Sequence, residues 1–200
     1  GADDLAHVLR PESEGGCLHH KGQVEVVSSL ERDGRPVYRD LRWGVYVVLE
    51  ASNDYTAACF HEYGMNTDES GRYSAMYKPF HLIGLEVNIS ILSAAILNKP
   101  TGSTQGFVGD VVATAKRDLK NGEVLDGEGG YTVYGKLMPS EISLQIGGLP
   151  IGLSDGVTLN APVAANQQLS WSDVDIDQSS LTWKLRQEME KYYSPAKAAE

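Results

Sequence analysis

Four polar side chains between residues 78 and 88 are the strongest candidates for chemistry in this sequence. Lys78 stands just before a long apolar segment, and His81, Glu86 and Asn88 lie within it. A lysine in such a place can anchor or protonate a carbonyl or phosphate oxygen, and a histidine can move a proton near neutral pH. On one α-helix, His81 and Asn88 would lie about 20° apart. The pattern predicts an acid–base site. The alternative is that Lys78 reaches solvent and His81 only begins the helix.

Glu86 is a second-rank candidate, as an acid or as a metal ligand. The same helical geometry places it about 140° from His81, so we expect the two not to share a small site. An uncompensated carboxylate among apolar neighbours is costly, which makes a partner necessary. We expect that partner to be Arg72 or a backbone group. Arg72 is also a candidate substrate-binding residue.

A metal site near the N-terminus is not expected. Cys17, His19 and His20 are good zinc ligands by type, but a closed site needs about four ligands at suitable spacing. The sequence offers no such set around them. With only one further cysteine, Cys59, we expect both cysteines to be thiols in a reducing compartment, by default the cytoplasm.

The elements that position these residues predict an α+β fold. Two β-branched runs, residues 23–30 and 43–49, read as strands joined by a turn at Asp33-Gly34. Residues 55–63 read as a short helix with cap residues before it and Gly64 after it. Residues 79–98 read as one helix between two prolines. It is apolar nearly all round and should therefore be buried against the strands.

After a linker near residues 102–109, the sequence changes to short apolar runs broken by turns, which is typical of a small β-rich unit. A last helix should follow Ser179-Ser180, with Leu181, Leu185, Met189 and Tyr192 on the face that docks. We therefore expect an α+β domain over 1–101, a β-rich domain over 109–178, and a helix with a tail over 179–200.

Composition excludes several classes of function. The chain has 17 Lys and Arg against 27 Asp and Glu, a net charge of −10, and its basic residues are scattered. Such a chain should not bind nucleic acid. The longest apolar stretch, residues 82–97, is too short and too polar to span a bilayer. A small molecule or a protein partner remains.

Two stretches in the second half resemble SAF domains, the fold shared by type III antifreeze proteins and the end of sialic acid synthases. They are residues 110–125, with the turn Lys120-Asn121-Gly122-Glu123, and residues 153–174. The resemblance implies a fold and not a function. Lys136 would reach a phosphate or sugar acid if such a domain folds over the site; the alternative is that it only shields a strand edge.

A second resemblance covers nearly the whole chain. Residues 24–34, 43–48, 76–86 and 126–139 are similar to the C-terminal region of homoserine-dehydrogenase-like and deoxyxylulose-phosphate reductoisomerase-like (DRL) NAD(P)-dependent oxidoreductases. In that family an N-terminal Rossmann domain binds NADP(H), a central domain completes the active site, and a SAF domain closes the chain. The sequence has no G-x-G-x-x-G after a strand, so we expect the upstream nucleotide domain to be missing and NADP(H) not to bind tightly here.

The resemblance implies part of an oxidoreductase that transfers hydride between NADP(H) and a small, possibly phosphorylated, hydroxy or keto compound. Lys78 and His81 would then serve as proton or oxyanion partners, and the protein would be a homo-oligomer. The alternative is a non-enzymatic module that uses its sheet and SAF surface for oligomerisation or sugar-acid binding.

Overall fold

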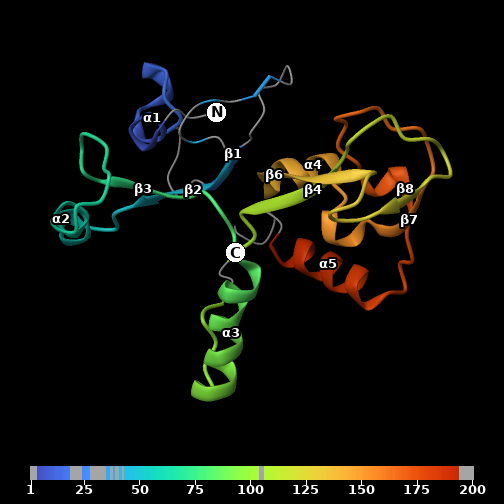
Figure 1. The fold of residues 1–200 in the computed structure, drawn as a ribbon. Helices are drawn as coiled ribbons and strands as arrows, with labels where there is room; N and C mark the ends of the chain where they lie inside the picture. Colours follow the sequence, from blue (N-terminus) through green and yellow to red (C-terminus); the bar gives the residue numbers. More distant parts are fainter. Residues whose placement is uncertain are drawn as a thin grey trace. The chain divides into compact units, whose positions relative to one another are not determined.

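The computed structural model describes residues 4–18, 24–27, 35, 36, 38, 41, 43–103 and 106–193. The chain forms two compact units, residues 1–101 and 102–200 (Figure 1). Each unit has its own buried apolar cluster.

The first unit is built on an antiparallel sheet of three strands, in the order β1-β2-β3. These strands are β1 (Val24–Val27), β2 (Gly44–Glu50) and β3 (Tyr73–Lys78). In β2, Tyr46 and Val48 are buried while Val45 and Leu49 are exposed, which is the alternation of a sheet with one covered face. The cover on that face includes α1 (Leu5–Leu9), followed by the short turn η1 (Glu12–Glu14). The strands predicted over 23–30 and 43–49 are confirmed where described, and the turn at 33–34 lies outside the described residues.

Helix α2 (Asp54–Glu62) begins and ends where the sequence predicts. The side chain of Asn53 accepts a hydrogen bond from the backbone N–H of Thr56 at 2.9 Å, which caps the first turn. Gly64, just past the end, has a φ of +66°, a conformation that glycine adopts without steric cost. Local side-chain chemistry therefore sets this helix.

Helix α3 (Ile83–Leu97) begins four residues later than predicted. Lys78 is the last residue of β3, and Leu82 caps the helix with a non-helical backbone, so Pro79 and His81 lie before it and not in its first turn. Pairing of β3 with β2 holds this stretch extended up to Lys78, and helix formation starts only after it. The predicted end is confirmed, because Asn98 is left-handed and Pro100 follows.

The expected burial of this helix is wrong. No residue of α3 is buried, and its large aliphatic side chains are half or more exposed. Figure 1 shows the helix extending away from the end of β3. Its apolar composition is therefore not explained by packing against the strands.

The second unit consists of short strands around one core. β4 (Gly109–Ala115) pairs along its whole length with β6 (Val133–Pro139), and β5 (Val124–Asp126), β7 (Asp155–Leu159) and β8 (Val174–Asp175) form a second sheet. The other elements are α4 (Ser140–Ile146), η2 (Ile151–Leu153) and η3 (Trp171–Asp173). Sequence reasoning did not predict α4. The core consists mainly of Val, Leu and Ala from these segments.

Helix α5 (Leu181–Tyr192) forms where predicted, capped by Ser180, but its predicted docking face is wrong. Of the four residues on that face, Leu181, Leu185 and Tyr192 are exposed and Met189 is half-buried. Arg186 instead forms a two-armed ion pair with Asp110 of β4, and both side chains are nearly buried, at 11% and 6% exposure. Ser143 also donates to Asp110, and the guanidinium lies 5.0 Å from the centre of the Phe107 ring. This buried ion pair fixes which face of α5 turns inward.

The structure confirms the α+β class, with small antiparallel sheets and a C-terminal helix. In the part of the chain that the structure describes, no helix is long and apolar enough to cross a membrane.

Candidate functional site

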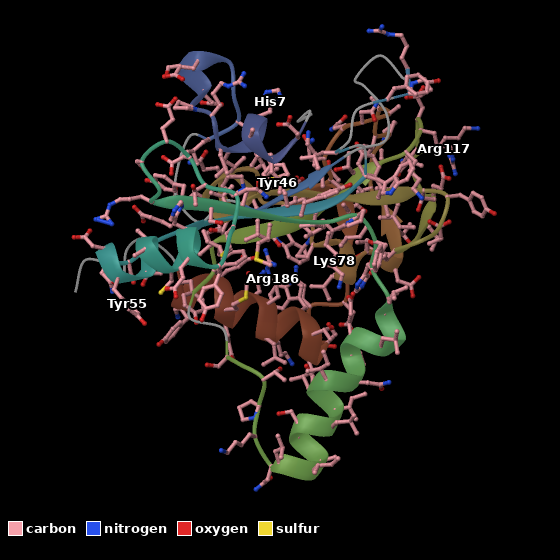
Figure 2. The ribbon with its side chains drawn as sticks, turned by 60° about the vertical axis from the view of Figure 1, so that its left-hand side comes forward. His7, Tyr46, Tyr55, Lys78, Arg117 and Arg186 are labelled. Atoms are coloured by element: carbon pink, nitrogen blue, oxygen red, sulfur yellow. The ribbon has the colours of Figure 1, made fainter. Side chains whose placement is uncertain are left out.

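Strand pairing fixes the backbone of Lys78. It lies opposite Val45 in the β2–β3 register, at the last paired position of β3. Gly44 has a φ of +111°, and a Cβ there would overlap the Lys78 carbonyl oxygen, so a glycine is required where β2 passes this point. The Tyr77 hydroxyl donates to the backbone oxygen of Trp43 and ties the same strand ends together. Lys78, labelled in Figure 2, thus has its backbone fixed at the paired end of β3.

Glu86, in the first turn of α3, joins two of the predicted residues. Its Oε1 accepts a hydrogen bond from Lys78 Nζ, and its Oε2 contacts His81 Nδ1. The backbone N–H of Leu82 also donates to Oε1, at 3.3 Å, so the same carboxylate caps the start of the helix. We call Lys78, His81 and Glu86 the 78–81–86 cluster.

The electrostatics of the cluster favour an ionised Glu86. The hydrogen bond from Lys78 lowers the pKa of Glu86 to about 2, against the opposing effect of partial desolvation, with help from His81 and from the Leu82 N–H. An ionised carboxylate only accepts hydrogen bonds, so His81 must donate through Nδ1–H. Its other ring nitrogen, Nε2, is left to accept a proton in the neutral imidazole and to donate one in the imidazolium. The His81 side chain is 69% exposed, so a ligand can approach this ring.

His81 also borders an open, shallow depression at the start of α3. Asn88 lines the same depression, together with residues 82–85. His81 and Asn88 thus lie close together, as predicted, although His81 precedes the helix and is not part of it. The depression is mainly apolar in its walls and has an imidazole and an amide at its edge.

The expected separation of Glu86 from His81 is wrong. It assumed that both residues lie on one helix, whereas His81 precedes the helix and its ring turns back to the first turn. Of the two partners expected for Glu86, the backbone group is confirmed, as the N–H of Leu82, and Arg72 is not. Arg72 donates to Asp54 at 3.1 Å, in an ion pair on the surface.

Lys136 lies in the middle of β6, opposite Val112 of β4, and its side chain is exposed. It belongs to the second unit, and Lys78 belongs to the first. Lys136 is therefore not a member of the 78–81–86 cluster.

The glycine-rich turn at 127–130 does not fit a dinucleotide. It connects strand β5 to the segment that leads into strand β6, whereas the turn that binds a dinucleotide connects a strand to a helix. The Asp126 carboxylate accepts hydrogen bonds from the Thr132 hydroxyl and from the backbone N–H groups of Tyr131 and Thr132, which hold its pKa well below the usual range. A pyrophosphate would need those N–H groups and would meet a fixed negative charge. An Asp followed by a glycine-rich turn was the sequence signal for this arrangement, and it was missed.

Within the described ranges, no three His, Cys, Asp or Glu side chains gather as metal ligands would. His19 and His20 lie outside those ranges. The expectation that Cys17, His19 and His20 form no metal site is therefore not tested by the described residues.

Comparison with known proteins finds one family model that matches the part of the chain that contains the cluster. Residues 1–87 match the family model of the catalytic domain of oxidoreductase DRL. That range contains Lys78, His81 and Glu86 and ends within the first turns of α3. No curated protein matches the chain. The match confirms the resemblance to DRL oxidoreductases for residues 1–87 and supports a generic oxidoreductase role.

Proposed function

We propose that this chain carries the substrate side of an NADP(H)-dependent oxidoreductase that acts on a small hydroxy or keto compound, which can be phosphorylated. The observation that carries the proposal is the 78–81–86 cluster, in which one carboxylate holds an ammonium and an imidazole beside an open depression. The cluster lies within the range that matches an oxidoreductase catalytic domain.

Each member of the cluster has a distinct part in this chemistry. A carbonyl oxygen that becomes a hydroxyl must be stabilised as negative charge develops, and it must then gain a proton. Lys78 supplies positive charge and hydrogen-bond donors. His81 transfers the proton through Nε2, because Nδ1 is committed to Glu86. Glu86 is a positioning residue that fixes the histidine tautomer and the lysine head group.

The rest of the proposal concerns the wider protein. NADP(H) is bound by residues other than the glycine-rich turn, and Asn88 contacts the substrate. Arg72 in the first unit and Lys136 in the second are each proposed, separately, as a contact for an anionic group. Residues 109–178 are proposed to be a SAF domain, and the two cysteines, which are thiols in the structure, fit a reducing compartment such as the cytoplasm.

The test is turnover of the full-length protein with NADPH and a panel of small keto compounds. We expect Lys78→Met and His81→Gln to lower kcat, with loss of proton transfer alone worth ~10²–10⁴-fold, and to leave NADPH affinity nearly unchanged. Matched controls are Lys99→Met and His61→Gln, which change the same residue types outside the cluster and should keep parental turnover. Circular dichroism must show that all four variants fold.

Parental kcat in the folded His81→Gln and Lys78→Met variants would exclude this site. The pH profile separates the two roles further, because only loss of a proton-transfer group removes a limb of the kcat profile. A purely structural role of His81 would lower stability and leave the shape of the profile intact.

A non-enzymatic oligomerisation module is the second candidate function. The exposure of the apolar helix α3 favours it, since such a surface marks an interaction site. The absence of NADPH-dependent turnover with every compound, together with stable self-association, would decide for this candidate.

A further inference from the structure

The antiparallel sheet of the first unit has one covered face and one open face. Successive residues of a strand point to opposite faces, and residues paired across two strands point to the same face. Val45 and Val47 of β2 therefore share the open face with their partners in β3, which are Lys78 and Met76. Val45 is 37% exposed, Met76 is 57% exposed, and Val47 is half-buried. We call Val45, Val47 and Met76 the apolar wall.

The apolar wall leads up to the candidate site. Lys78 lies directly opposite Val45, and it follows Met76 by two residues on the same face. At the other end of this row in β3, Ser74 is buried and donates a hydrogen bond to the backbone oxygen of Asn66 at 2.9 Å. On this face, the open part of β3 therefore runs from Met76 to Lys78.

Lys78 can bind a further oxygen while it holds Glu86. An ammonium group has three hydrogen-bond donors, and among the described residues Lys78 donates to Glu86 alone. The Lys78 side chain is 55% exposed, so a ligand can reach the donors that Glu86 does not use. A ligand in this place would have an oxygen at Lys78 and apolar atoms against the wall.

The size of the apolar wall fits a small molecule and not a protein partner. A standard protein interface takes ~20–30 residues from each side, far more than the wall offers. Two residues along a strand span ~7 Å, which is about the length of a five- or six-carbon chain. An aliphatic chain of that length, with its polar end at Lys78, would cover Met76 and Val45.

We propose that the apolar wall binds the aliphatic chain of the substrate while Lys78 binds its reacting oxygen. The inference rests on the proposed function for its reaction and names the substrate class, which is straight-chain aliphatic keto and hydroxy compounds. Val45 and Met76 are specificity-determining residues, because they remove the methylene groups of a longer chain from water.

The first test measures binding to the 200-residue chain by NMR of ¹³C-labelled methionine methyl groups. The chain has four methionines, and Met76→Gln identifies the signal of Met76 by its loss. 2-Oxooctanoate should shift the Met76 signal and leave those of Met138 and Met189, which lie in the second unit. Pyruvate has the same polar end without the chain, so at equal concentration it should leave Met76 unchanged.

The second test measures specificity in the full-length protein with NADPH and four substrates: pyruvate, 2-oxobutanoate, 2-oxohexanoate and 2-oxooctanoate. kcat/KM should rise by up to about four-fold for each added methylene, which corresponds to ~0.8 kcal/mol per buried CH₂. Val45→Thr/Met76→Gln should remove this rise, since it keeps the side-chain shapes and adds polar atoms. The matched control, Val124→Thr/Met189→Gln, makes the same changes in the second unit and should keep the rise. Circular dichroism must show that both double variants fold.

The two tests separate this inference from the proposed function. If 2-oxooctanoate leaves the Met76 signal unmoved, or if pyruvate moves it equally, the wall does not bind the chain and the inference fails. It also fails if turnover occurs but kcat/KM does not rise with chain length, or if the rise survives in Val45→Thr/Met76→Gln. A selective shift of Met76 without turnover of any compound would overturn the proposed reaction while it supports the wall as a binding site. The NMR test on the parent does not depend on how the variants fold.

Discussion

Among single residues, Glu86 does the most to organise the candidate site. One carboxylate accepts from Lys78, contacts His81 and caps α3 through the Leu82 N–H. A glutamate in the first turn also favours the helix by complementing the positive end of its dipole. Site and helix start therefore depend on the same ionised group.

This dependence predicts a response to acid. The pKa of Glu86 is about 2 in the folded chain, whereas an unfolded glutamate titrates at about 4.3. Because folding lowers this pKa, the stabilisation is complete above about pH 4.3 and is lost as the pH falls toward 2. Carboxyl NMR shifts should give Glu86 a midpoint of about 2 in the parent, and Lys78→Met should raise it. An ordinary midpoint in the folded parent would contradict the cluster.

Among the elements, α5 shows how one buried ion pair can override an apolar pattern. Burial disfavours the charged form of Asp110, but the hydrogen bonds from Arg186 and Ser143 outweigh it and lower the pKa of Asp110. Arg186 also donates to Glu190 at 2.5 Å. Turning the helix to bury Leu181 and Leu185 would break this network. The helix therefore keeps its leucines exposed.

This arrangement predicts a large loss of stability for Arg186→Met. The change leaves Asp110 buried without its cation, and breaking a buried pair in this way costs ~3–5 kcal/mol. The control is Arg117→Met, which removes an arginine whose side chain is half exposed, paired with Glu123, and should change stability little. Denaturant unfolding followed by tryptophan fluorescence measures both. Similar small losses in the two variants would show that Arg186 does not fix α5.

At the scale of the whole molecule, the division into residues 1–101 and 102–200 predicts where the chain is open to proteases. Brief digestion should cut first within 102–109 and give two fragments of nearly equal size, since connecting segments between compact units are the preferred sites of nicking. Mass spectrometry identifies the cut. A first cut between residues 111 and 139 would contradict this division, because that range lies within the second unit and its two ends are paired with each other in β4 and β6.

The sequence by itself determined the elements that depend on neighbours along the chain. Cap residues and Gly64 set α2, β-branched runs gave β2, and Pro100 ended α3. It also identified Lys78 and His81 as candidates, because residue type alone limits which side chains can move protons. These features follow from interactions within a few residues.

Tertiary structure alone decided the relations between distant residues. Because β3 pairs with β2 up to Lys78, helix α3 starts only at Ile83, and His81 turns back to contact Glu86. The angle of about 140° expected between these two residues on one helix therefore does not apply. Asp110 and Arg186 are 76 residues apart, and their pairing decides which face of α5 is buried. No local pattern encodes either contact, because each depends on where the backbone brings remote side chains together.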